Sequence, residues 1–145
     1  EHPYLAGLSM GGYGAMRLAP AQPDRCAAAG SFPGSLDMAN RPAHADQAWC
    51  VEFSRVFGDL GAIAGSENDL FELARRLSPV DRRRLRLFQC CGTEDFLYDA
   101  NVRFRDHARS LGLDLTYEES PGTHEWGYWD AAVQRFLKWL VPAGA

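Results

Sequence analysis

The chain has 145 residues, about the length of one average domain, and 46% of them are hydrophobic and 23% charged. This composition excludes wholesale disorder, and no apolar run reaches the length of a membrane span. Fifteen Lys and Arg against nineteen Asp and Glu give a net charge of −4, which argues against a nucleic-acid binder driven by phosphate contacts.

Short apolar segments alternate with helical patterns along most of the chain. Strands are predicted at residues 4–6, 26–29, 85–91 and 113–118. Helices are predicted after Ser9 and at residues 70–77, 104–111 and 129–140, the first of them ended by Pro20 and Pro23. Alternation of this kind is typical of the α/β class, in which helices cover a mostly parallel sheet.

One segment, at about residues 37–84, breaks the alternation and is predicted to be an irregular insert. Helical periodicity is clear in it only at residues 70–77, which follow a capping box running from Ser66 to Asp69. The arginines at residues 82–84 are interpreted as a solvated turn rather than a ligand site. Just before the insert, residues 31–34 are predicted to form another turn.

The four cysteines are expected to be buried, reduced thiols. They include the adjacent pair Cys90-Cys91, and their spacing matches neither a disulfide framework nor a metal site. No cofactor is implied. No signal peptide or targeting leader is visible, so the expected location is the cytoplasm.

The run Gly7-Leu8-Ser9-Met10-Gly11 matches the G-x-S-x-G pattern of a nucleophilic serine. This chemistry needs a sharp strand-to-helix turn that exposes the hydroxyl, and glycines on either side let the backbone pass without a Cβ clash. An apolar strand precedes the motif and a small-residue helix follows it, as the turn demands. Ser9 is therefore the candidate nucleophile, and the Met10 N–H is the candidate oxyanion donor.

A serine nucleophile needs a base, and His124 is the favoured candidate among four histidines. It lies on a loop between the last strand and the last helix, whereas His2 is terminal, His44 is in the insert and His107 is inside a helix. Loops that follow parallel strands meet at the carboxyl edge of the sheet, on the same side as Ser9.

The acid that would orient this base is predicted to be Asp95, which lies three residues beyond Gly92 on the loop that leaves a strand. Glu94 and Asp99 are rivals, although Asp99 fits better as a helix cap. The chain order Ser9, Asp95, His124 is nucleophile, acid, base, which is the order in α/β-hydrolases.

The sequence around these residues resembles the tributyrin esterase group, relatives of esterase D and S-formylglutathione hydrolase. The resemblance rests on four segments, at residues 6–15, 65–71, 90–98 and 121–129. It implies an α/β-hydrolase fold and a serine carboxylesterase that cleaves short acyl esters of small molecules, with Ser9, Asp95 and His124 as the triad.

Enzymes of this group carry roughly another hundred residues before the serine motif, including the early strands and a second oxyanion donor. We therefore expect this chain to be the C-terminal portion of one α/β-hydrolase domain. The alternatives are an S-formylglutathione-type thioesterase, an acyltransferase on the same scaffold, or an inactive fragment that serves only as an interaction module. The oligomeric state, including a homo-oligomer, is left open.

Two tryptophans follow His124 closely enough to flank a reacting ester. Trp129 falls on the apolar stripe of the last helix and is interpreted as a core residue. Trp126 is the better candidate for a substrate-binding side chain.

Overall fold

The computed structural model describes residues 2–40 and 45–141. A four-stranded parallel sheet in the order β1-β2-β3-β4 organises the molecule. Its strands are β1 (Tyr4–Ser9), β2 (Ala28–Gly34), β3 (Arg86–Gly92) and β4 (Asp114–Ser120). The register pairs Ser9 with Gly34, and Gly92 with Ser120. The carboxyl ends of all four strands therefore lie along one edge of the sheet, and their loops leave from that edge.

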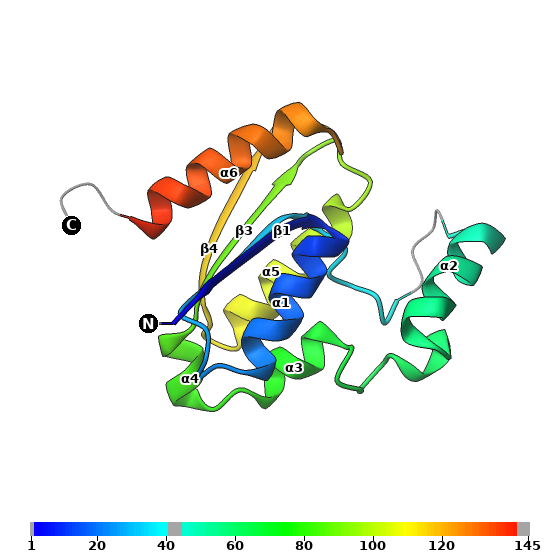
Figure 1. Ribbon diagram of the computed structural model, residues 1–145, viewed down its shortest axis with the longest axis horizontal. Coiled ribbons are helices and arrows are strands. Elements are labelled where there is room, and N and C mark those ends of the chain that lie inside the picture. Colours follow the sequence, from blue (N-terminus) through cyan, green and yellow to red (C-terminus); the bar gives the residue numbers. More distant parts are fainter. Residues whose placement is uncertain (1, 41–44, 142–145) are drawn as a thin grey trace.

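Helices cover both faces of this sheet (Figure 1). Helices α1 (Met10–Ala21) and α5 (Tyr98–Ser110) pack on one face, and α6 (Trp126–Leu140) packs alone on the other. The expected alternation of strands and helices in an α/β protein is confirmed. None of the helices in the described ranges combines the length and the apolar character that a membrane crossing requires.

Two apolar clusters hold these layers together. The larger one lies between the sheet, α1, α5 and the insert, with Met16 and Phe104 almost completely buried. The smaller one lies under α6, where Phe136 contacts Phe32 and Phe88 edge to face at centroid distances of 5.3 and 5.6 Å. A Cβ on Gly30 would come within 2.7 Å of the Phe136 ring, so this glycine lets α6 approach the sheet.

The strands extend further than the sequence pattern predicts. β1 continues to Ser9, and residues 31–34, predicted to be a turn, complete β2. Pro33 is tolerated there because the pairing of β2 with β3 ends at Ser31, so its missing N–H interrupts no bond to that neighbour. Pro20 likewise lies inside the last turn of α1 and does not end it.

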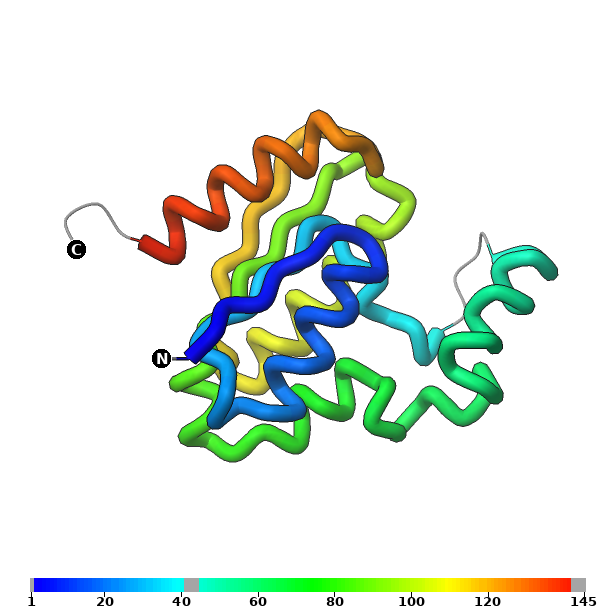
Figure 2. Tube along the Cα trace, viewed as in Figure 1, coloured from blue at the N-terminus to red at the C-terminus, as the bar shows by residue number. Residues whose placement is uncertain are grey.

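The predicted irregular insert is largely helical. It contains α2 (Gln47–Phe57), a 3₁₀ turn η1 (Leu60–Ala62), α3 (Leu70–Arg76) and α4 (Pro79–Arg84). Figure 2 shows that α2 stands apart from the sheet.

Short polar contacts explain the helix boundaries within the insert. The N-cap of α3 is Asp69, whose carboxylate accepts bonds from the N–H groups of Phe71 and Glu72, so the predicted capping box from Ser66 is wrong. The arginines at residues 82–84 end α4 and do not form a turn. Their positive charge is favourable there because the last turn of a helix exposes carbonyl groups.

The cysteines are free thiols, as expected, and three of the four are buried. Burial raises the pKa of Cys90 to about 11. Cys50, on α2, is only half-buried and departs from the expectation.

Candidate active site

Ser9 stands at the sharp turn between β1 and α1. Its φ of 53° is the one positive value at a non-glycine residue in the described ranges, a strained conformation that a tight strand-to-helix turn imposes. A Cβ on Gly7 would overlap the backbone of Gly11, so glycine is required at position 7. Gly11 itself faces open space. The second tight position is Gly12, where a Cβ would lie 2.6 Å from the Ser31 hydroxyl oxygen.

Three side chains from distant parts of the chain form a hydrogen-bonded row at the carboxyl edge of the sheet. His124 Nε2 lies 3.1 Å from Ser9 Oγ, and His124 Nδ1 lies 2.9 Å from Asp95 Oδ2. A carboxylate can only accept, so Nδ1–H donates to Asp95 and leaves Nε2 free to accept from the serine hydroxyl. The structure thus brings together the three residues that the sequence singled out.

Asp95 is held rigidly inside the loop after β3. Its side chain is fully buried, and its second oxygen, Oδ1, accepts the N–H of Leu97 at 2.8 Å. The backbone turns tightly around it, since Asp95 N donates to Gly92 O and Tyr98 N donates to Asp95 O. The carboxylate is therefore fixed in position before any substrate arrives.

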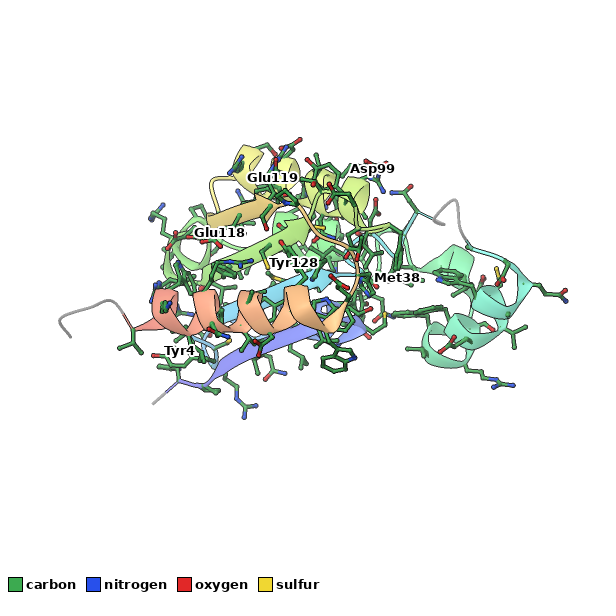
Figure 3. All side chains as sticks on the ribbon, turned by 90° about the horizontal axis from the view of Figure 1, so that it is seen from above. Tyr4, Met38, Asp99, Glu118, Glu119 and Tyr128 are labelled. Carbon is green, nitrogen blue, oxygen red and sulfur yellow. The ribbon has the colours of Figure 1, made fainter. Side chains whose placement is uncertain are left out.

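The two rival carboxylates lie elsewhere. Asp99 is an exposed residue in the first turn of α5, pointing away from the sheet (Figure 3). It does not cap that helix, whose N-cap is Leu97, so the predicted capping role is wrong. Glu94 points to the neighbouring loop, where its Oε2 accepts the N–H of Gly122 at 2.6 Å.

This bond from Glu94 belongs to a set that joins the loop carrying Asp95 to the loop carrying His124. Glu94 N donates to Gly122 O at 3.1 Å, and Thr93 N donates to Ser120 O at 3.0 Å. The two backbones come so close that a Cβ on Gly92 would overlap the Gly122 carbonyl. The bond from Gly122 N–H, together with one from Thr93, lowers the pKa of Glu94. Sequence reasoning treated Glu94 only as a possible acid and missed this contact.

Aromatic rings surround the His124 imidazole. Phe96 lies at a centroid distance of 4.6 Å, and Trp129 stands edge-on at 4.9 Å. Trp129 also packs against the cluster under α6, as expected of a core residue. It therefore contacts both the core and the His124 imidazole. Trp126 is 74% exposed and contacts Trp129 at 5.0 Å.

A mostly apolar cavity of about 260 Å³ opens beside the serine. Ser9 and Met10 line it, together with apolar side chains that include Met38, Trp49 and Phe53. In Figure 3, Met38 lies between the end of the sheet and α2. Trp126 and His124 are not among the described residues that line it. The binding role expected for Trp126 stays a prediction.

A charged pair borders the same cavity. Asp37, whose side chain is 1% exposed, accepts bonds from Arg103 Nε and from Asn40 Nδ2, both at 2.8 Å. These two donors satisfy the buried carboxylate, and the bond from Arg103 holds the segment after β2 against α5. Sequence reasoning missed this cavity wall, although aromatic residues at positions 49, 53 and 57 carried the spacing of one helical face.

Comparison with known proteins identifies related sequences over nearly the whole chain. A family model described as putative esterase matches residues 2–140. An acetyl esterase from Caldicellulosiruptor saccharolyticus is 29% identical in an alignment of 145 positions that covers 97% of this chain and 54% of that protein.

Solved structures give the same result. An S-formylglutathione hydrolase from Staphylococcus aureus is 31% identical, with a TM-score of 0.80 over 95% of this chain and 54% of its own. A fluorophosphonate-binding serine hydrolase from the same organism is 30% identical, with a TM-score of 0.81 over 95% of this chain and 53% of its own. The chain therefore spans about half the length of the relatives it matches.

Proposed function

The chain belongs to the putative esterase family and has the α/β-hydrolase fold, and from this premise we propose that it is the catalytic part of a serine carboxylesterase acting on short acyl esters. The observation that carries the proposal is the row from Ser9 Oγ through His124 to the buried carboxylate of Asp95. A serine hydroxyl, an imidazole and a carboxylate in this geometry constitute a nucleophile, a base and an orienting acid.

The reaction proceeds in two acyl transfers. Ser9 Oγ attacks the ester carbonyl while His124 Nε2 takes the hydroxyl proton, and Asp95 stabilises the imidazolium that forms. The tetrahedral intermediate collapses as His124 returns the proton to the departing alcohol, leaving an acyl group on Ser9. Water then attacks this acyl-enzyme with His124 again as base, and the acid is released as Ser9 recovers its proton.

The Met10 N–H supplies one hydrogen bond to the oxyanion of these intermediates. Met10 is the first residue of α1, and the first N–H groups of a helix have no partner within it. The helix dipole adds partial positive charge at the same end. An oxyanion beside Ser9 Oγ would therefore form at the helix N-terminus.

The size of the cavity favours small substrates. Its volume of about 260 Å³ lies below the roughly 300–1,000 Å³ typical of drug-sized ligand sites. Its wall is mainly apolar, which suits an alkyl chain better than a sugar or a peptide.

Covalent labelling tests the proposed nucleophile directly. A fluorophosphonate probe should modify the peptide spanning residues 7–17, and p-nitrophenyl butyrate should be hydrolysed. Ser9→Ala should abolish both. Labelling that survives this substitution would overturn the assignment of Ser9.

A thioesterase of the S-formylglutathione type is the second candidate, favoured by the 31% identity to the S. aureus hydrolase. It would use the same three residues and differ only in the leaving group. Comparing kcat/KM for p-nitrophenyl acetate and for S-formylglutathione decides between the two.

A further inference from the structure

Helix α2 contributes an aromatic wall to the cavity beside Ser9. Trp49, Phe53 and Phe57 follow one another at four-residue intervals and share one face of the helix. Their rings stack in series, with centroid distances of 4.4 Å between Trp49 and Phe53 and 6.3 Å between Phe53 and Phe57. The opposite face carries Val51, which is 47% exposed.

This aromatic row connects α2 to the helix that begins at the nucleophile. Phe57 meets the ring of Tyr13, on α1, edge to face at 5.4 Å. Tyr13 is itself buried and donates its hydroxyl to Asn68 O at 2.8 Å, which ties α1 to the end of the insert. No residue of α2 is fully buried, and Trp49, Phe53 and Phe57 are the residues of this helix that pack against the larger apolar cluster.

The position of the cavity indicates which part of an ester it receives. Ser9 and Met10 line it, whereas His124 is not among the described lining residues. The leaving alcohol must take a proton from His124 Nε2, so it departs on the histidine side of Ser9. The acyl group, which stays bonded to Ser9 Oγ, is the part that extends into this cavity.

We propose that Trp49 and Phe53 form the end wall of the acyl pocket and limit the length of the acyl chain. This inference rests on the proposed esterase function. The cavity volume of about 260 Å³ lies below the roughly 300–1,000 Å³ of sites for drug-sized ligands. The preferred substrates are therefore esters of short, unbranched apolar acids, and longer chains meet the indole of Trp49.

The test compares two substrate series on the protein and its variants. The first is p-nitrophenyl esters with acyl chains from acetyl to dodecanoyl, and the second is acetate esters of alcohols of increasing length. Trp49→Ala and Phe53→Ala should raise the ratio of kcat/KM for decanoyl to butanoyl esters about tenfold or more, because one methylene in an apolar pocket changes kcat/KM by about 10- to 200-fold. Val51→Ala, on the opposite face of α2 and not among the described residues that line the cavity, should leave the ratio unchanged.

Truncation of a stacked ring can also disturb α2, so Trp49→Leu, which keeps an apolar side chain, is the third pocket variant. In each variant, labelling of Ser9 by a small fluorophosphonate and an unchanged midpoint of thermal unfolding show that the site and the fold are intact. With that established, an unchanged acyl ratio in all three pocket variants overturns the inference and leaves the esterase proposal standing. A shift in the alcohol series alone overturns the assignment to the acyl group. If the starting protein is neither labelled nor active on any ester, the proposed function itself fails.

Discussion

Replacing Glu94 with alanine tests whether the bond between the acid loop and the base loop matters for catalysis. Glu94 Oε2 accepts the N–H of Gly122, two residues before His124, at 2.6 Å. Alanine removes this acceptor and leaves the Gly122 N–H to water. The loop that carries the imidazole then keeps its backbone bonds, from Thr93 N to Ser120 O and from Glu94 N to Gly122 O. His124 should therefore stay near Asp95 but occupy its productive position for less of the time.

The expected loss follows from what remains. A misplacement of about 1 Å can cost about 10²-fold in rate. Because two backbone bonds and the bond between His124 and Asp95 persist, we expect kcat to fall by about tenfold in Glu94→Ala. KM should change little, since Glu94 is not among the described residues that line the acyl cavity. Glu94→Gln keeps an acceptor oxygen and should recover most of the activity.

The pKa of Glu94 sets the pH range in which the comparison is valid. The bond from Gly122 N–H, together with one from Thr93, lowers this pKa below its ordinary value. Because this pKa is lowered in the folded protein, the stabilisation that ionised Glu94 provides is fully present above the ordinary pKa of a glutamate. It is lost as the pH falls through the lowered pKa. Near neutral pH the side chain is a carboxylate, and the ratio of wild-type to Glu94→Ala kcat should not vary with pH there.

Steady-state kinetics on a p-nitrophenyl ester, with Glu125→Ala as a control, provides the measurement. Glu125 is an exposed acid next to His124, and its side chain does not cap α6. Losing its charge should have far less effect on kcat than losing Glu94. Equal losses in the two alanine variants would show that charge alone is responsible. An unchanged kcat in Glu94→Ala, or no recovery in Glu94→Gln, would refute the positioning argument.

Further predictions concern the acid, the base loop and the core. Asp95→Asn should lower kcat by about 10⁴-fold, the scale of the equivalent change in another serine hydrolase, whereas Asp99→Asn should have little effect. The reverse result in steady-state assays would show that Asp95 is not the acid. Gly122→Ala should reduce activity strongly, because φ is +154° and a Cβ would lie 2.5 Å from the ring of Tyr128; unaltered kinetics would contradict this. Phe136→Ala, measured by urea unfolding, should cost about 3–5 kcal/mol, and a cost under about 1 kcal/mol would mean that α6 contributes little to stability.

The sequence predicted the α/β class and the loops that carry Ser9, Asp95 and His124, because these depend on local patterns. Apolar runs mark the strands, and in a parallel sheet the residue after each strand lies at the same edge. Ser9 and His124 are 115 positions apart in the sequence, yet they are expected to lie close together because each lies at or after the end of a parallel strand. That inference does not need the helices to be placed correctly.

The errors occur where tertiary contacts override local preference. Residues 31–34 contain Ser, Pro and Gly and are typical of a turn, yet they lie buried at the end of β2, paired with β1 and in contact with the start of α1. The end of β2 is held by neighbours distant in sequence, since the side-chain amide of Asn101, on α5, donates to Gly34 O at 2.9 Å. Contacts of this kind, between residues distant in the sequence, cannot be predicted from a short stretch of neighbouring residues.

The cavity wall was missed for a related reason, and this distinguishes the cavity from the row of Ser9, His124 and Asp95. The row is built from loops whose positions the sheet dictates, so their residue types and order are sufficient to find them. The cavity is built from α2, whose place is set by ring contacts from Trp49 through Phe53 and Phe57 to Tyr13. Substitutions in that ring series can change which acyl group fits without touching Ser9, Asp95 or His124. Differences in substrate between relatives that share the serine motif are therefore expected to lie in the segment between β2 and β3.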